Sequence, residues 1–122
     1  TDINYEDFYK FFIDNKADIL VASIPYRVSI PYAIFEHKKH NITSLMEKPE
    51  HIYYANAGIY LIKKSMLSFI PKNKFFNATD LLHQAIDKKK NVLYYPMHNY
   101  WLDIGKPQDF KKANKDILNL NL

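Results

Sequence analysis

A run of mainly apolar and β-branched residues from Ile19 to Ile24 constrains the fold of this chain more than any other stretch. The run lacks the polar alternation of a half-exposed strand, and Pro25 follows it directly. A continuous run of this kind predicts a strand that is buried on both faces and ends at the proline. The 122 residues, of which 48% are hydrophobic, are enough to bury a core around such a strand.

Other segments predict helices and strands in alternation. Helices are expected from a cap at Asn4 to Asn15, from a cap at Ser65 through Phe69, from Asn77 or Thr79 to the lysines at 88–90, and from Pro107 through Leu118. Further strands are expected at Ala33–Glu36, Ile42–Glu47, Ala57–Ile62, Val92–Tyr95 and Tyr100–Leu102, the first two forming a hairpin. This interleaving predicts a single α/β domain with a mixed sheet.

Composition excludes several kinds of site. The chain has no cysteine, which excludes a disulfide framework and thiolate metal sites, so oxygen or imidazole must hold any metal. It has only two glycines, too few for a glycine-rich phosphate loop. No apolar run approaches the roughly 18 residues of a membrane span, and no secretory pattern opens the sequence. We therefore expect a cytoplasmic protein without a membrane partner, either processed before Thr1 or part of a longer chain.

The net charge of +4 does not by itself indicate a nucleic-acid partner. Lysines are interspersed with carboxylates except at 88–90 and at 111, 112 and 115, where solvated lysine at a helix end is the favoured interpretation. We therefore expect no nucleic-acid binding. The histidines at 37, 40, 51, 83 and 98 lack the spacing of a metal site and are expected to be surface or core residues.

Three short polar motifs lie at or beside predicted strands. They are Glu47–Lys48–Pro49, Asn56–Ala57–Gly58–Ile59–Tyr60 and Trp101–Leu102–Asp103–Ile104–Gly105. An ordinary structural explanation stays open for each. Glu47 and Lys48 fit a solvated strand exit, Gly58 fits a bulge or close strand packing, and Asp103 fits a cap for the helix at Pro107. Trp101 is more readily explained as a core residue than as a ligand stack.

Taken in order, these motifs resemble the sugar-1-phosphate nucleotidyltransferases, or sugar-nucleotide pyrophosphorylases, such as mannose-1-phosphate guanylyltransferase and glucose-1-phosphate thymidylyltransferase. Thr79–Asp80 adds to the resemblance, and Thr1–Tyr5 is similar to the segment that follows the central metal-binding aspartate of that family. The resemblance covers the C-terminal half of the family's catalytic domain. It implies a Rossmann-like, glycosyltransferase-A-like fold in which residues 1–122 are the sugar-phosphate-binding half, with the nucleotide-binding half missing upstream.

The resemblance also implies a reaction and the residues that serve it. The parent enzyme would transfer a nucleoside monophosphate from a nucleoside triphosphate (NTP) to a sugar 1-phosphate with Mg²⁺ as cofactor, and the isolated fragment would be inactive. The implied catalytic residues are Asp103, which also binds the metal, and Lys48, which meets the sugar phosphate. The implied sugar-binding residues are Glu47, Lys48, Asn56, Gly58, Tyr60 and Ala33. Two departures from the family pattern are Tyr32–Ala33 in place of Tyr-Gly and Asn77 near the position of a glutamate.

The sequence leaves a second hypothesis open. The chain would then be a non-catalytic regulatory or oligomerisation module that kept the fold and covers an open sheet edge by pairing with a second copy. A homo-oligomer is accordingly possible under both hypotheses. The sequence leaves open which nucleotide and which sugar are used.

Overall fold

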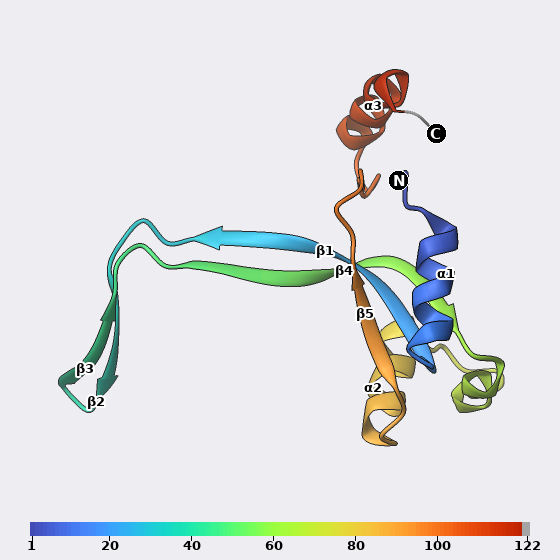
Figure 1. Ribbon diagram of the computed structural model, residues 1–122, viewed down its shortest axis with the longest axis horizontal. Coiled ribbons are helices and arrows are strands. Elements are labelled where there is room, and N and C mark those ends of the chain that lie inside the picture. Colours follow the sequence, from blue (N-terminus) through green and yellow to red (C-terminus); the bar gives the residue numbers. More distant parts are fainter. Residues whose placement is uncertain (121–122) are drawn as a thin grey trace. The chain divides into compact units, whose positions relative to one another are not determined.

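The computed structural model describes residues 1–120, and the chain divides into two compact units (Figure 1). The first, which we call the packed unit, consists of Thr1–Ile24 and Asn56–Leu122. The second, the ribbon unit, consists of Pro25–Ala55. Strands β1 (Ile19–Ser29) and β4 (Glu50–Ile62) each continue from one unit into the other.

A three-stranded sheet lies at the centre of the packed unit. Its order is β4-β1-β5, and β1 pairs in parallel with β5 (Val92–Pro96) from Ile19 opposite Val92 to Ser23 opposite Pro96. The first five residues of β1 are all buried, which confirms the prediction of a strand buried on both faces. The predicted α/β fold with a mixed sheet and flanking helices is likewise confirmed.

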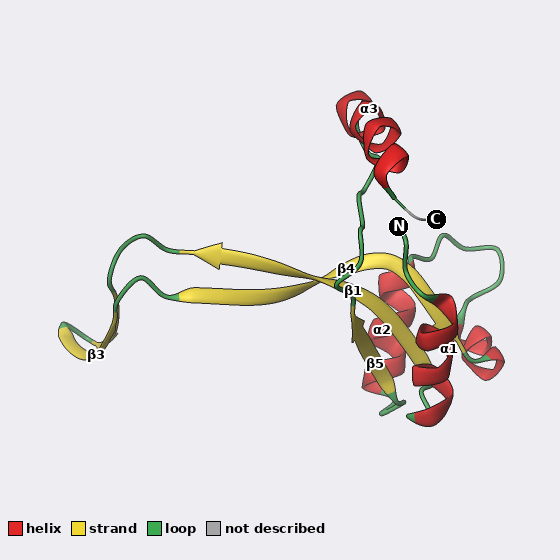
Figure 2. Ribbon diagram, turned by 45° about the horizontal axis from the view of Figure 1, so that its top comes forward, coloured by secondary structure: helices red, strands yellow, loops and turns green. Residues whose placement is uncertain are grey.

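Helices cover both faces of this sheet, as Figure 2 shows. On one face α1 (Tyr5–Asp14) packs on the cluster of Ile3, Phe8, Ala17, Leu20, Ala22, Ala57 and Met97. On the other face α2 (Ala78–Asp87) and the 3-10 helix η1 (Lys64–Phe69) contribute to the cluster of Ile19, Val21, Met66, Leu81 and Ala85. Successive residues of β1 alternate between the two clusters, as the two-residue period of a strand requires.

Side chains define most helix starts as predicted. Asn4 Oδ1 accepts hydrogen bonds from the amides of Glu6 and Asp7 at 3.0 and 3.2 Å, which begins α1. The amide of Asn77 donates to Asp80 Oδ2 at 2.8 Å, so Asp80 holds the N-terminus of α2. The prediction for Ser65 is wrong, because η1 begins at Lys64 and has no side-chain cap.

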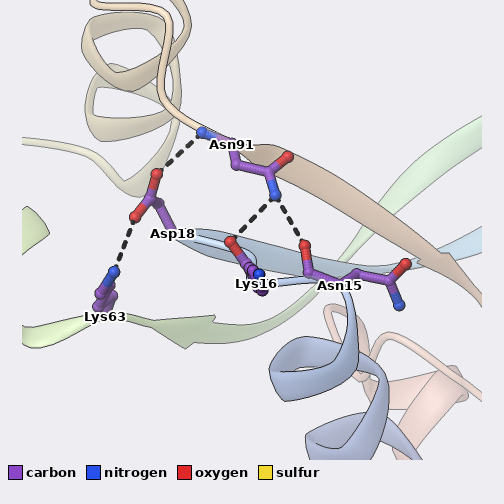
Figure 3. Close-up of polar contacts among 5 residues, drawn as sticks. All are labelled: Asn15, Lys16, Asp18, Lys63 and Asn91. Carbon is purple, nitrogen blue, oxygen red and sulfur yellow. Dashed lines mark hydrogen bonds and ion pairs between the residues drawn. The ribbon is translucent and has the colours of Figure 1, made fainter.

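A polar network centred on Asp18 joins three strands at one end of the sheet, as Figure 3 shows. Asp18 accepts from the amide of Asn91 at 2.9 Å and from Lys63 Nζ at 3.4 Å. The Asn91 side chain in turn donates to the carbonyls of Asn15 and Lys16 at 2.9 and 3.0 Å. These bonds, led by that from the Asn91 amide, lower the pKa of Asp18 despite partial burial. The network ties the end of α1 to the starts of β1 and β5 and the end of β4.

Two strand predictions need correction in length. β1 does not end at Pro25 but continues to Ser29, because its pairing with β5 stops at Ser23 and a proline is tolerated where a strand has lost a neighbour. β4 begins at Glu50 rather than Ala57. Residues 50–54 are exposed, so they carry no alternation of apolar and polar side chains that would reveal a strand.

The C-terminal part differs most from expectation. Tyr100–Leu102 is not a strand but part of an irregular segment. The helix α3 (Pro107–Asp116) forms where predicted and is followed by the 3-10 turn η2 (Ile117–Asn119), yet no residue within Pro107–Asp116 is buried. The apolar side chains of this C-terminal stretch at 110, 117 and 118 are exposed. Tyr5 of α1 and Ile86 of α2 are exposed as well, although their helical spacing from other apolar residues predicts that both side chains face inward.

The ribbon unit contains the predicted hairpin. Strands β2 (Ile34–Lys38) and β3 (Asn41–Met46) pair antiparallel, with an irregularity between Glu36 and His37. Lys39 turns the chain with a φ of +55°. No residue between 25 and 55 is buried. The ribbon unit is therefore held by its strand pairing and surface contacts rather than by a core.

Candidate active site

Three of the predicted site residues form a hydrogen-bonded set on β4 in the packed unit. Asn56 Oδ1 accepts from the amide of Gly58 at 2.8 Å, and Asn56 Nδ2 donates to the hydroxyl of Tyr60 at 2.7 Å. Asn56 and Gly58 are exposed and Tyr60 is half-buried. The set therefore presents a carboxamide and a phenol, both held in place, beside an exposed stretch of backbone.

Gly58 is required for its backbone conformation. Its φ is +75°, in the region that side chains with a Cβ rarely adopt. A Cβ built there would meet no atom within 4 Å, so close strand packing does not explain this glycine. The space over Gly58 is open, so a ligand could approach the backbone at this residue.

Asp103 lies in an irregular segment that two aromatic side chains hold in place. Trp101 Nε1 donates to the carbonyl of Ala57 at 2.9 Å, and the hydroxyl of Tyr100 donates to Asp116 Oδ2 at 2.6 Å. The first bond joins the segment to β4, and the second joins it to α3. Among residues 1–120 the exposed Asp103 carboxylate has no hydrogen bond or ion pair. It does not cap α3. The amide of Lys106, the residue that precedes the helix, donates instead to Asp109 Oδ2 at 3.1 Å.

A charged group supports the Tyr100 contact. Lys112 Nζ lies 2.6 Å from Asp116 Oδ2 and 5.6 Å from the centre of the Tyr100 ring. The hydrogen bonds from Lys112 and Tyr100 lower the pKa of Asp116, and the bond to Asp116 raises the pKa of both Tyr100 and Lys112. The ionised Asp116 therefore tethers α3 to the segment that bears Asp103.

The remaining predicted residues belong to the ribbon unit. Glu47 and Lys48 link β3 to β4 and are exposed, and within residues 1–120 neither side chain has a hydrogen-bonding or ionic partner. Lys48 has a φ of +43°, a costly conformation for a residue with a Cβ. Lys16, Lys39, Asn73 and Lys89 also have a left-handed φ, so the value at Lys48 marks a bend and not by itself a functional site. Ala33 is exposed between β1 and β2.

The described residues form no complete metal site. No group of three or more histidine, aspartate or glutamate side chains gathers anywhere in residues 1–120. Asp103 therefore has no neighbouring histidine or carboxylate side chains that would complete a metal site with it in the described part of the chain. Nor does any described helix have the length and apolar character to cross a membrane.

Comparison with known proteins identifies the family. The family model described as nucleotidyl transferase matches residues 1–119. This chain belongs to the nucleotidyl transferase family. The match confirms the resemblance to sugar-1-phosphate nucleotidyltransferases that the ordered motifs suggested.

Individual nucleotidyl transferases give the extent of the similarity. The bifunctional protein GlmU of Methanocaldococcus jannaschii is 30% identical over 125 residues, which cover 97% of this chain and 30% of that protein. A Sulfolobus acidocaldarius protein assigned as a mannose-1-phosphate guanyltransferase is 31% identical over 91 residues, 73% of this chain and 25% of that protein. The chain therefore spans less than a third of the length of these two relatives.

A solved structure supports the fold. A crystal structure from Bacillus anthracis, assigned as a glucose-1-phosphate thymidylyltransferase and bound to sucrose, matches with a TM-score of 0.66 and 21% identity. The match covers 99% of this chain and 52% of that one. At 21% identity this similarity shows a shared fold and nothing about function.

Two contacts in the candidate site were not predicted. The bond from Trp101 to Ala57 joins residues 44 positions apart, and that from Tyr100 to Asp116 depends on where α3 lies. Trp101 packs against the cluster beside α1, in line with its predicted place in the core. Because a buried indole N–H usually finds a partner, the sequence indicated that Trp101 would donate a bond, though not to which carbonyl.

Proposed function

We propose that this chain is the sugar-phosphate-binding half of the catalytic domain of a sugar-1-phosphate nucleotidyltransferase. The parent enzyme would join a nucleoside monophosphate from an NTP to a sugar 1-phosphate and release pyrophosphate. One observation carries the proposal. The polar set of Asn56, Gly58 and Tyr60 is bonded through Ala57 to the segment with the unpaired Asp103, in a chain of the nucleotidyl transferase family.

The reaction needs positioning more than covalent chemistry. A phosphate oxygen of the sugar 1-phosphate attacks the α-phosphorus of the NTP and forms a new P–O bond. The bond from the α-phosphorus to the oxygen that bridges to the β-phosphate breaks, and pyrophosphate leaves with that electron pair. Charge in such a transition state is spread over phosphoryl oxygens, so cations and hydrogen-bond donors that hold both substrates in line supply most of the catalysis.

The proposed roles follow from the chemistry of each side chain. Lys48 would neutralise the sugar phosphate as a point charge, and Glu47 would accept hydrogen bonds from sugar hydroxyls. Asn56 and Tyr60 would bond the sugar, Gly58 would present open backbone to it, and Ala33 would line the wall. The unpaired state of Glu47 and Lys48 supports these roles, because no partner within residues 1–120 competes for them.

Asp103 fits one position in a Mg²⁺ site. Mg²⁺ prefers oxygen ligands and is held by one or two carboxylates together with substrate phosphates and water. The exposed, unpaired Asp103 carboxylate has this chemistry. A bound Mg²⁺ would neutralise charge on the reacting phosphates. We expect the second carboxylate to come from the nucleotide-binding half, so the isolated chain should be inactive.

A pyrophosphate-release assay tests the proposal. In the full-length parent, a panel of NTPs and sugar 1-phosphates should give turnover with at least one pair. Asp103→Asn should lower kcat roughly a hundredfold or more, because it removes a metal ligand at the reacting phosphates. Asp14→Asn, which alters an exposed carboxylate at the end of α1, is the matched control and should retain activity.

Three outcomes would contradict parts of the proposal. Full activity of the Asp103→Asn parent would remove the metal role. Turnover by the 122-residue chain alone would show that it is more than half of a site. A full-length parent that binds sugar phosphates but never turns over would favour the non-catalytic module.

A further inference from the structure

The peptide group between Ala57 and Gly58 is held at both ends by side chains. Its carbonyl oxygen accepts from the indole of Trp101 at 2.9 Å, and its N–H donates to Asn56 Oδ1 at 2.8 Å. Because both bonds use the same peptide plane, they fix the plane's orientation together. That orientation in turn sets the unusual φ of Gly58.

The series of hydrogen bonds that begins at Trp101 extends through Asn56 to Tyr60. The carboxamide of Asn56, already fixed by Gly58, donates from Nδ2 to the Tyr60 hydroxyl at 2.7 Å. Donor and acceptor alternate without interruption from Trp101 to Tyr60, and each bond polarises the next, which strengthens the series. The Tyr60 oxygen acts as an acceptor here, so its own O–H proton remains to be donated. The series thus ends on a hydroxyl donor whose position is set from Trp101.

The start of the series lies beside Asp103. Trp101 precedes Asp103 by two residues in a segment without regular secondary structure. The indole is half-buried against the cluster that includes Ala57. This packing fixes the position of the ring, and the hydrogen bond fixes the direction of its N–H. Ring packing and hydrogen bonding therefore place Asp103 relative to the Asn56 set within the packed unit.

We propose that Trp101 is a positioning residue that acts through the Ala57–Gly58 peptide to orient Asn56 and Tyr60 and to align them with Asp103. The sugar-facing and metal-facing parts of the site are then a single hydrogen-bonded assembly. The identity of the ligand rests on the proposed function. The hydrogen-bonded series does not, so it can be tested without a ligand.

The composition of the chain makes the test unusually direct. It contains two glycines and one tryptophan, so [15N]glycine labelling gives amide signals for Gly58 and Gly105 only, and [15N]tryptophan labelling gives one indole signal. Trp101→Phe keeps an aromatic ring and removes the N–H. We expect the Gly58 amide proton to move upfield and to exchange faster with solvent, because its bond to Asn56 is no longer polarised from the carbonyl side.

Tyr100→Phe is the matched control. It removes one polar hydrogen from the neighbouring aromatic residue, but that hydrogen bonds to Asp116 and not to β4. The Gly58 amide signal should therefore stay in place. If Trp101→Phe leaves the Gly58 amide unchanged, or if Tyr100→Phe moves it equally, the proposed role of Trp101 is wrong.

A reciprocal variant keeps the test decisive if Trp101→Phe does not fold. Asn56→Ala removes the acceptor for the Gly58 amide and leaves Trp101 intact. The indole N–H signal should then move upfield, since the Ala57 carbonyl becomes a weaker acceptor. An unchanged indole signal in this folded variant would overturn the proposal.

Kinetics of the full-length parent connect the series to ligand binding. Trp101→Phe should raise KM for the sugar 1-phosphate roughly three- to tenfold and leave KM for the NTP unchanged, which a general loss of folding would not do. Equal changes in both KM values would contradict the proposed alignment. Absence of turnover in the unaltered parent would instead refute the proposed function and leave the two NMR results standing.

Discussion

The packed unit and the ribbon unit use the same two strands in opposite ways. In the packed unit Ile19–Ser23 of β1 are buried on both faces, whereas Pro25–Ser29 of the same strand contain no buried residue. β4 shows the same change between its exposed first half and its partly buried second half. Burial therefore stabilises only the part of each strand that lies in the packed unit.

The ribbon unit relies on polar contacts in place of a core. The amide of Ile30 donates to the carbonyl of Pro49 at 3.1 Å, Ser44 Oγ donates to Glu36 Oε2 at 3.0 Å, and Arg27 pairs with Glu50 at 3.2 Å. An isolated two-stranded hairpin is at best marginally stable in water. We therefore expect stability to be concentrated in the packed unit.

The largest expected effect comes from shortening a buried side chain in the packed unit. Leu20 is 0% exposed and lies in the cluster beside α1, so Leu20→Ala should lower the free energy of unfolding by about 3 kcal/mol. Ile42 in the ribbon unit is 62% exposed, and Ile42→Ala should cost less than about 0.5 kcal/mol. Urea unfolding followed by Trp101 fluorescence measures both. Equal losses would show that the two units do not differ as described.

A second comparison concerns backbone strain. Gly58 and Lys48 have left-handed φ values of +75° and +43°, one in each unit. Gly58→Ala should destabilise by about 1–2 kcal/mol, because it places a Cβ in that conformation. Lys48→Ala should change stability by less than about 0.5 kcal/mol, since a Cβ is present before and after.

Gly105→Ala is the control for the Gly58 variant. The φ of Gly105 is not left-handed, and a Cβ there would lie 3.8 Å from Asp103 Oδ2, an ordinary contact. This variant should be near neutral in the same urea experiment. A loss as large as that of Gly58→Ala would mean that glycine is needed at 105 for another reason.

The Asp18 network provides a pH-dependent test of the packed unit. Its bonds to Asn91 and Lys63 lower the pKa of Asp18 in the folded state, so its contribution is present above the ordinary value of about 4. The contribution is lost as the pH falls through the lowered folded pKa. Asp18→Asn should therefore cost about 1 kcal/mol at neutral pH and progressively less in acid.

Unfolding of Asp18→Asn by urea at neutral and at acid pH measures this difference. Asp14→Asn serves as the control, because the exposed Asp14 has no hydrogen-bonding or ionic partner within residues 1–120. A loss for Asp18→Asn that does not depend on pH would show that the carboxylate charge is not what stabilises the network.

The difference between the units also explains what the sequence could predict of the fold. The caps at Asn4 and Asn77 bond to residues close to them in sequence, so the starts of their helices were predicted well. The continuous apolar run Ile19–Ile24 likewise predicted the buried part of β1. The first half of β4 and the end of β1 are exposed, so no alternation of side chains marked them. Tyr100–Leu102 has the residue types of a strand but does not pair with one. Within residues 1–120 it is held by the side-chain bonds of Tyr100 and Trp101 and by a backbone bond from the amide of Asp2 to the carbonyl of Tyr100.

The candidate site was predictable to a similar degree. The order of Glu47–Lys48, Asn56–Tyr60 and Asp103 along the chain was enough to indicate the family that the comparisons then identified. Gly58 could be singled out because glycine is rare here, although its φ could not be known. The pairing of Trp101 with Ala57 depends on how β4 meets the segment after β5, which local sequence does not encode.

The smallest expected effect lies in the ribbon unit. The side chains of Arg27 and Glu50 are 65% and 48% exposed, and an exposed ion pair contributes less than about 1 kcal/mol. Arg27→Gln should therefore leave global unfolding nearly unchanged and should speed hydrogen exchange at the Ile30 amide slightly, more at low salt than at high salt. Amide exchange by NMR at two salt concentrations measures this local effect. If Arg27→Gln lowered global stability as much as Leu20→Ala, the ribbon unit would have to unfold together with the core, and its lack of buried side chains would not make it the weaker part.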